Sequence, residues 1–287
     1  MLKILLQTTI SYAADDWNVT RFSRLRDEIA GLTNPDGSPA ATVTARDREP
    51  DARGVDPVLA TLDQSDNDQL WLIGVDTGGE TGLGPDECAA LTRFRKRGGA
   101  IFSTRDHQDL GSSICGLGGI GRAHYFHSTN PDPDPARNQR DDPFTTSIDY
   151  PNYHSGSNGN VQRVRPEGSP HEVLRDGARV IALLPAHPHE GSVGAPAGDP
   201  SARVVVTGTS EVTGRPFNIA VAFEADDGSG RGWAESTFHH FADYNWDIRA
   251  GCPTFVTEPP SDAIIENPAL LDDTKRYVRN IVRWLGG

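Results

Sequence analysis

Strand and helix patterns alternate along the chain from residue 3 to residue 104. The run QLWLIGVD at residues 69–76 is largely apolar, as expected of a strand that is covered on both faces. In residues 19–32, apolar side chains recur three and four positions apart, which predicts a helix. Strands are expected at 3–9, 41–47, 69–76 and 100–104, and helices at 19–32, 56–63 and 85–99. This βαβαβαβ order predicts an α/β fold: a doubly wound, mostly parallel, flavodoxin-like sheet with helices on both faces.

The pattern weakens at residues 128–170, which begin STNPDPDPARNQRDDP and contain few aliphatic side chains. This segment is either a linker to a second domain or a long loop over the rim of the same domain. Too little chain follows for a complete second domain, and loops of this length are commonly functional or disordered. We therefore expect a single domain over residues 1–287, with 128–170 as a loop excursion. Further strands are expected at 179–185, 203–209, 218–224 and 233–238, and a last helix at 267–287.

The charge of the chain restricts its partners. The formal net charge is −13 and no basic run is present, which argues against nucleic acid or an anionic membrane as a partner. No segment approaches the roughly 20 apolar residues of a membrane span. The cysteines Cys88, Cys115 and Cys252 form no CxxC pair, so reduced thiols and a cytoplasmic location are expected. The expected partner is a small molecule. The sequence leaves open whether the chain forms a homo-oligomer.

Polar side chains follow several of the expected strands. Doubly wound sheets bind ligands beyond the carboxyl ends of their strands, so the residues just after each strand are the site candidates. They are Asp76 and the TGGETGLG loop after the third strand; Arg105, Asp106, His107 and Asp109 after the fourth; His187, His189 and Glu190 after residues 179–185; and His239, His240, Asp243, Tyr244, Asn245 and Trp246 after residues 233–238. Most of the histidines converge on one rim, which predicts a site there.

Two segments resemble a known family. RKRGGAIFST at residues 95–104, with polar residues at its end, and FHHFADYNWD at 238–247 resemble the ThuA-like branch of the class I glutamine amidotransferase-like superfamily. The order of elements is similar over nearly the whole chain. In the amidotransferases a cysteine nucleophile lies on the sharp turn after the GGAIFST-type strand, and a later strand ends in a His-Pro-Glu that completes the triad.

The resemblance implies a site without that nucleophile. The turn contains Thr104, Arg105 and Asp106 and no cysteine, which excludes glutaminase chemistry by the family mechanism. ThuA-like proteins generally place a histidine in this region, and here Arg105 or His107 would have to serve.

The resemblance also assigns the second segment. His239-His240-Phe241 stands where the family has His-Pro-Glu, so His240 matches the family histidine and Asp243 is the nearest acid. The loop GGETG at residues 78–82 resembles the family loop that offers backbone N–H groups to an oxyanion.

The main hypothesis is an enzyme, of hydrolase or lyase type, that acts on a sugar-like or polyol substrate by Asp/His acid–base chemistry. Imidazole titrates near neutrality, and a neighbouring carboxylate fixes its tautomer. Adjacent residues leaving a strand point to opposite faces, so we expect His240 to face the crevice, with Asp243 or Asp106 setting its tautomer and His239 behind it or at the ligand's margin. The expected catalytic residues are Asp106, His107, His240 and Asp243, and the expected substrate-binding residues are Gly79, Glu80, Arg105, His239, Tyr244, Asn245 and Trp246.

Tyr244 and Trp246 are expected to offer a flat apolar face to a sugar ring. No cofactor is expected under this hypothesis. Two other functions stay open. One is a metal-dependent hydrolase that binds zinc or another divalent ion through ligands drawn from His107, His187, His189, His239 and His240. The other is a non-catalytic ligand- or partner-binding module on a degenerate amidotransferase-like scaffold, because a fold does not determine a function.

The same residues also have structural interpretations. Asp106 can cap a helix by accepting backbone N–H bonds. A single buried histidine is usually a hydrogen-bonded core residue, and a lone glycine-rich loop is a plain turn as often as a ligand cradle. Cys115 lacks the sequence of a nucleophile turn, which favours a packing role, and His124 with His127 favours a strand edge over one face of a helix.

Overall fold

The computed structural model describes residues 1–106, 108–133, 161–185, 192–209, 216–226, 228–256, 260 and 262–287. Of Glu80 and Ala263, only the backbone is described. Across these ranges, no helix is long and apolar enough to cross a membrane.

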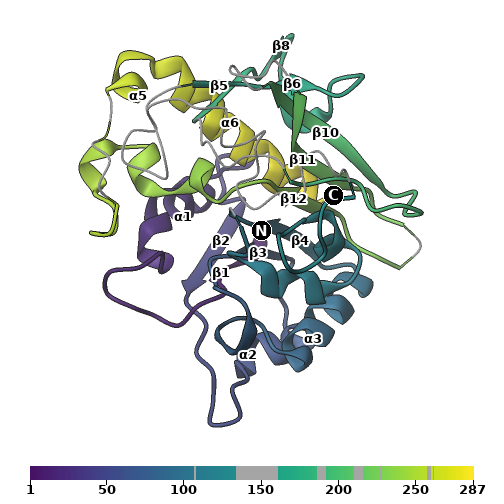
Figure 1. Cartoon of the computed structure of the whole chain (residues 1–287). Coiled ribbons are helices and arrows are strands. Elements are labelled where there is room, and N and C mark those ends of the chain that lie inside the picture. Colours follow the sequence, from purple (N-terminus) through teal and green to yellow (C-terminus); the bar gives the residue numbers. More distant parts are fainter. Residues whose placement is uncertain are drawn as a thin grey trace.

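The described ranges form a central sheet of eight strands in the order β2-β1-β3-β4-β12-β11-β10-β6 (Figure 1). Neighbouring strands from β2 to β12 are parallel, whereas β11, β10 and β6 join antiparallel. This confirms an α/β fold with a mostly parallel sheet, and the order β2-β1-β3-β4 is consistent with a flavodoxin-like fold. The strands are β1 Leu2–Thr8, β2 Ala41–Arg46, β3 Gln69–Ile73, β4 Ala100–Thr104, β6 Arg165–Pro166, β10 Ala202–Thr209, β11 Pro216–Phe223 and β12 Gly232–Glu235.

Helices cover both faces of the sheet: α1 and α6 pack on one face, and α2 and α3 on the other (Figure 1). The α-helices are α1 Ser23–Ala30, α2 Pro57–Ala60, α3 Pro85–Lys96, α5 Ala263–Glu266 and α6 Pro268–Leu285. Short 3₁₀ helices connect the elements: η1 Val19–Phe22, η2 Leu62–Gln64, η3 Gly79–Thr81, η4 Ser112–Leu117, η5 Ile120–Ala123, η6 Glu172–Leu174, η7 His239–Phe241, η8 Asp243–Asn245 and η9 Ile248–Ala250. Short strands outside the central sheet are β5 Val161–Arg163, β7 Arg175–Asp176, β8 Arg179–Val180 and β9 Leu183–Pro185.

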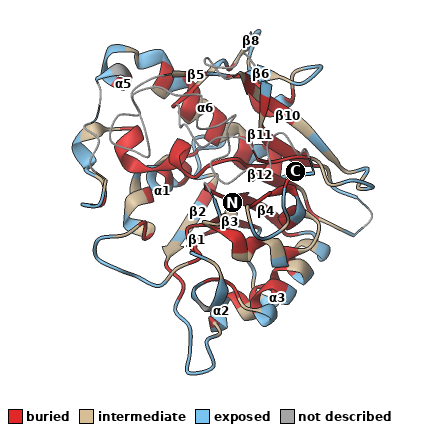
Figure 2. Cartoon of the chain, viewed as in Figure 1, coloured by how far each residue is buried: buried red, intermediate tan, exposed pale blue. Residues whose placement is uncertain are grey.

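The apolar run of β3 explains why helices lie on both sides. Trp71 and Ile73 point into the core shared with α1 and α6, and Leu70 and Leu72 point into the core shared with α2 and α3. Successive side chains of a strand alternate between its two faces, so a strand without polar positions must be covered on both. The four side chains are fully buried, and the centre of the sheet is red throughout in Figure 2.

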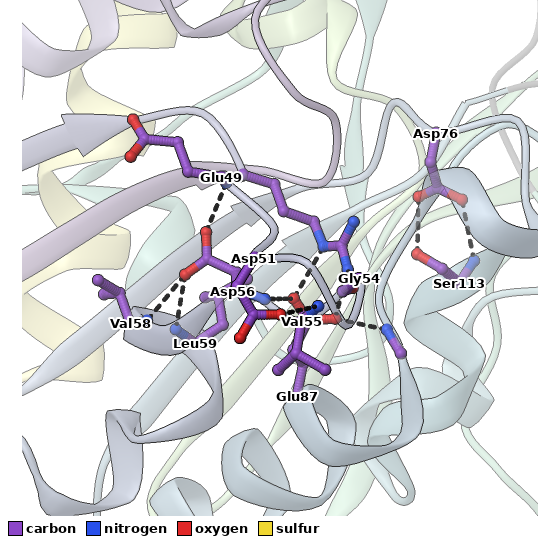
Figure 3. A network of polar contacts seen from close by, with 12 residues as sticks. Glu49, Asp51, Gly54, Val55, Asp56, Val58, Leu59, Asp76, Glu87 and Ser113 are labelled. Carbon is purple, nitrogen blue, oxygen red and sulfur yellow. Dashed lines mark hydrogen bonds and ion pairs between the residues drawn. The ribbon is translucent and has the colours of Figure 1, made fainter.

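Two buried carboxylates position the starts of α2 and α3 (Figure 3). Asp56 accepts hydrogen bonds from the backbone N–H groups of Val58 and Leu59 and so caps α2. Glu87, in the first turn of α3, accepts a 2.9 Å hydrogen bond from the backbone N–H of Asp56. Glu87 also forms a buried 2.8 Å ion pair with Arg48, which ties the segment after β2 to the start of α3.

The strand predicted at residues 179–185 is not part of the central sheet. Its two halves, β8 and β9, pair instead with β7 and β5 in two-stranded ribbons. The carboxylate of Asp273 on α6 accepts hydrogen bonds from the N–H groups of Ala182 and Leu183 at 3.1 and 3.2 Å. Because these donors bind a helix side chain, they are not available to the ladder of the central sheet.

The loop predicted at residues 128–170 ends earlier than expected. β5 and β6 lie within that range, and β6 pairs with β10 at the edge of the central sheet. Val164, between the two strands, is buried. Residues 134–160 lie outside the described residues.

Candidate functional site

A cavity of about 330 Å³ lies at the carboxyl ends of the parallel strands. Its walls follow β1, β3, β4 and β12, and the strand order reverses between β1 and β3. Ligands of flavodoxin-like sheets bind at such a reversal. The lining residues are Asp16, Trp17, Val75, Thr77, Asp106, Leu110, Phe238, His239, Phe255 and Val256.

Asp106 and His239 meet at the wall of this cavity. The Oδ1 atom of Asp106 lies 3.4 Å from Nε2 of His239, and both residues are only 2% exposed. The backbone N–H of Phe238 also donates a 3.0 Å hydrogen bond to the carbonyl oxygen of Arg105. The segment after β12 therefore reaches the segment after β4, so residues that follow these two strands do meet at one rim.

His239 is held from behind by its own turn of chain. Nδ1 of its ring forms a short hydrogen bond with the hydroxyl group of Tyr244, and the side-chain amide of Asn245 donates to its carbonyl oxygen. Its backbone N–H donates to Oγ1 of Thr237 at 3.1 Å. The two 3₁₀ turns η7 and η8 make these contacts possible, because they fold Tyr244 and Asn245 back onto His239. Tyr244 and Asn245 therefore support the histidine instead of lining the cavity.

His240 does not line the cavity, contrary to our expectation. Its ring is fully buried, and Glu235, not Asp243 or Asp106, contacts its Nδ1 atom, at 2.8 Å. The expectation relied on the alternation of a strand, but β12 ends at Glu235 and both histidines belong to the 3₁₀ turn that follows. The ring that reaches the cavity is that of His239.

Asp243 has a structural role at the start of α1. Its carboxylate accepts hydrogen bonds from the N–H and the hydroxyl group of Ser23 at 3.1 and 2.6 Å, and from the N–H of Arg24 at 2.8 Å. A carboxylate at this end of a helix satisfies free N–H groups and complements the helix dipole. The prediction of Asp243 as a catalytic residue is therefore not supported by its position.

Arg105 and Trp246 also lie away from the described cavity walls. The guanidinium group of Arg105 packs over the ring of Phe126 at 4.8 Å and donates to the carbonyl oxygen of Gln108. The indole N–H of Trp246 donates to the carbonyl oxygen of His240 at 2.8 Å, and its ring is 4% exposed. Neither is in a position to bind a ligand in this cavity.

The aromatic walls come from residues that the sequence analysis did not select. Trp17 is the centre of the group, with ring centroids 5.2 Å from Phe238 and 6.4 Å from Phe255. Trp17 and Asp16 follow β1, so the rule that selected Asp106 would have found them had it been applied to the first strand. Phe255 lies in an irregular segment before α5, and no periodicity or motif marks it.

The glycine-rich loop after β3 is attached to the rim by Asp76. The carboxylate of Asp76 accepts from the hydroxyl group of Ser113 at 2.7 Å (Figure 3), and from the N–H of Gly78 at 2.9 Å. Gly78 and Gly79 have φ angles of 80° and 61°, which residues with side chains adopt only with strain. The loop is thus a turn that needs its glycines, and Gly79 is not among the cavity walls.

On the other face of β4, His124 is fully buried and the half-buried Cys115 packs against the core. Nε2 of His124 lies 2.9 Å from the hydroxyl oxygen of Ser103, and burial lowers the pKa of His124 to about 3. Burial raises the pKa of the Cys115 thiol to about 12. An extended backbone at His124, which forms a bridge with Val193, agrees with the strand-edge interpretation.

The metal hypothesis depends on residues that lie largely outside the described ranges, namely His107, His187 and His189. Among the residues that are described, no three His, Cys, Asp or Glu side chains gather as metal ligands. Glu190 also lies outside the described residues, and the side chain of Glu80 is not described.

Comparison with known proteins places the chain in no established family. No family model matches the sequence, and no curated protein matches it. A cytoplasmic protein from Salmonella typhimurium is similar in structure, with 10% identity, a TM-score of 0.41, and 96% of this chain and 98% of that chain covered. The glutaminase domain of Trypanosoma brucei CTPS with bound acivicin is similar with 13% identity, a TM-score of 0.39, and coverage of 97% and 94%. At these TM-scores the likenesses identify neither family nor activity.

Proposed function

We propose that the protein is an enzyme that acts on a small sugar-like or polyol molecule, with Asp106 and His239 as its acid–base pair. The observation that carries this proposal is the placement of both side chains on the wall of one cavity, 3.4 Å apart. Carboxyl and imidazole groups are common proton donors and acceptors in enzymes. The rings of Trp17 and Phe255 give the same cavity flat apolar surfaces, which suit the apolar face of a sugar ring.

The proposed roles follow from which atoms are already engaged. Nδ1 of His239 is bound by Tyr244, so Nε2 is the atom directed toward Asp106. A substrate hydroxyl or carbonyl oxygen that enters beside the pair can exchange a proton with Nε2 of His239 or with the carboxyl group of Asp106. Tyr244 acts as a positioning residue, because its hydroxyl group fixes the orientation of the imidazole ring.

We also infer that the chain is a ThuA-like member of the class I glutamine amidotransferase-like superfamily, with a doubly wound domain. The first segment that carries the resemblance covers the end of α3 and β4, and the second covers the turns that follow β12, the strand that pairs with β4. None of the described cavity walls is a cysteine, in agreement with chemistry other than that of a glutaminase. His107 remains a predicted catalytic residue outside the described residues.

A loop over the rim remains part of the proposal. Ser128, at the start of the predicted excursion, donates 2.8 Å hydrogen bonds from its N–H and its hydroxyl group to Asp109. Asp109 precedes the cavity residue Leu110, so the segment begins beside the cavity.

Activity screening with sugars, keto-sugars and polyols, followed by two variants, tests the proposal. In Asp106→Asn and His239→Gln, turnover of any substrate found is expected to fall by about 10² or more while the melting temperature stays close to that of the parent. His240→Gln is the matched control, since its ring lies outside the cavity; it is expected to lower the melting temperature and to keep turnover per folded molecule. Full activity of Asp106→Asn and His239→Gln would exclude the pair as the catalytic groups. Saturable binding without turnover would favour the non-catalytic module.

A further inference from the structure

Apart from the imidazole of His239, the ionisable groups in the described cavity walls are all carboxyl groups. Asp16 and Asp106 contribute carboxyl groups, and none of the described lining residues is a lysine or an arginine. The side chain of Asp106 is almost completely buried, so a negative charge on its carboxyl group is poorly screened by water. Such a wall disfavours phosphate, sulfate and carboxylate groups on a ligand.

Two arginines that lie close in sequence to the cavity acids, Arg21 and Arg105, are engaged elsewhere. Arg21 donates to the backbone carbonyl oxygen of Asp16, and its guanidinium group lies 3.8 Å from the carboxylate of Asp15, which is not a cavity wall. Arg105 packs over Phe126 on the other side of β4. Neither guanidinium group offsets the acids from within the described walls.

Aromatic rings surround the same space. Trp17, Phe238 and Phe255 line the cavity, and the ring of His239 lies 5.2 Å from that of Trp17. Phe255 is 58% exposed although it faces its aromatic neighbours, so a large apolar ring stays accessible at the mouth. The faces of aromatic rings attract cations, and aromatic cages with nearby carboxylates bind organic ammonium groups.

We propose that this cavity binds an organic cation: a small molecule that carries a positively charged ammonium group next to an apolar or sugar-like body. This inference rests on the proposed function in that it concerns the same cavity, and it narrows the substrate to amine-bearing compounds. Asp106 and Asp16 pair with the charge, and the rings of Trp17 and Phe255 contact the body of the ligand.

Three probes of nearly equal shape separate charge from size. Choline carries a quaternary ammonium group, 3,3-dimethylbutan-1-ol replaces that nitrogen with carbon, and 3,3-dimethylbutanoate carries a negative charge on a similar frame. Calorimetric titration of the full chain is expected to show choline binding about tenfold more tightly than the alcohol, the scale of a desolvated cation–π contact, and no binding of the acid. Equal or weaker binding of choline than of the alcohol, tightest binding of the acid, or no detectable binding of choline would each overturn the proposal.

Variants of the cavity residues test whether the preference for choline over the alcohol arises in the cavity. Asp106→Asn and Asp16→Asn are expected to weaken choline binding while leaving the alcohol unaffected. Asp66→Asn removes the same charge from an exposed residue that pairs with Lys3, and it is expected to change neither affinity. Phe255→Leu alters an exposed ring, so the variant is expected to fold. It is expected to weaken the binding of choline more than the binding of the alcohol. An equal loss in Asp66→Asn would assign the preference to the net charge of the protein and overturn the proposal.

The outcome is separable from that of the proposed function. If choline shows no preference but Asp106→Asn abolishes turnover of a neutral sugar, the cation inference fails and the acid–base function stands. If choline is preferred and no substrate is turned over, the cavity is a binding site for cations and the enzymatic proposal fails.

Discussion

Two neighbouring histidines belong to two clusters of similar composition. Each cluster combines an imidazole ring with a carboxyl group and a tyrosine hydroxyl group. The cavity cluster consists of Asp106, His239 and Tyr244, and the core cluster of Trp233, Glu235, His240 and Tyr277. The two differ in access: His239 lines a cavity, whereas His240 is fully buried beside Glu235.

The comparison shows that contact between a histidine and an acid does not by itself mark a catalytic site. In the core cluster Glu235 accepts 2.8 Å hydrogen bonds from the indole N–H of Trp233 and from the hydroxyl group of Tyr277, and it contacts Nδ1 of His240. Those bonds connect β12, η7 and α6, which is a structural function. Only the cavity cluster has space beside it for a substrate.

Replacing Glu235 with alanine is the most severe test of this difference. The change removes the acceptor of two buried donors, on Trp233 and Tyr277, together with the carboxylate contact of His240. We expect a loss of about 3–5 kcal/mol in the free energy of unfolding. Choline binding per folded molecule is expected to stay within experimental error, because the cavity walls are untouched. Urea unfolding monitored by circular dichroism gives the first quantity and calorimetric titration the second.

The control is Tyr277→Phe, which removes one donor and keeps the ring. It is expected to cost only about 1 kcal/mol, the usual contribution of a single hydrogen bond. A stable Glu235→Ala variant that no longer binds ligand would reverse the assignment and place function in the core cluster.

The parts of the fold that were predictable have strong local patterns. β1, β2, β3 and β4 are apolar runs separated by helical periodicity. Each begins within about one residue of its expected start, and β3 ends at Ile73, earlier than the expected end at Asp76. The segment 179–185 looks the same in sequence, but its N–H groups bind Asp273 of α6, a contact between residues about ninety positions apart. Local pattern cannot show that competition.

The candidate site was predictable only where it follows strands. Asp106 and His239 were identified because parallel strands end at one rim. The sequence analysis expected His240 to face the cavity, but His239 does. The expectation assumed the alternating side chains of a strand, and a 3₁₀ turn begins at His239 instead. Phe255 comes from an irregular segment, and its place in the wall depends on tertiary contacts alone.

His124 is a third histidine whose ring is buried, and its burial has a measurable consequence for stability. Burial, with a smaller effect of Arg105, lowers the pKa of His124 from its ordinary 6.5 to about 3. Between these values the unfolded chain binds a proton that the folded chain does not, so acid reduces stability through this residue. The contribution amounts to about 1.4 kcal/mol per pH unit, or about 2 kcal/mol between pH 6.5 and pH 5.

His124→Gln removes this titration. The free energy of unfolding of the variant is expected to fall less than that of the parent between pH 6.5 and pH 5, as measured by urea unfolding at each pH. Ser103→Ala is the control, because it removes the 2.9 Å contact to the ring but keeps the titrating group, and its pH dependence is expected to match the parent. Identical slopes for the parent and His124→Gln would show that the ring is accessible to protons in the folded state.

The smallest expected effect concerns the mouth of the cavity. The carboxylate of Asp15 accepts hydrogen bonds from the N–H of Thr254 at 2.8 Å and from its hydroxyl group, and this bonding lowers the pKa of Asp15. It joins the loop that carries Trp17 to the segment that carries Phe255, so it holds two aromatic walls together. In Asp15→Ala we expect an unchanged melting temperature, because the carboxylate is exposed, and choline binding weaker by about two- to tenfold, because the walls must order on binding. Asp15→Asn retains an acceptor oxygen and is expected to bind nearly as the parent does. A large drop in melting temperature with unchanged affinity would instead show that the Asp15–Thr254 contact stabilises the fold. The distinction between a structural core cluster and a ligand-binding cavity would then no longer hold for this contact.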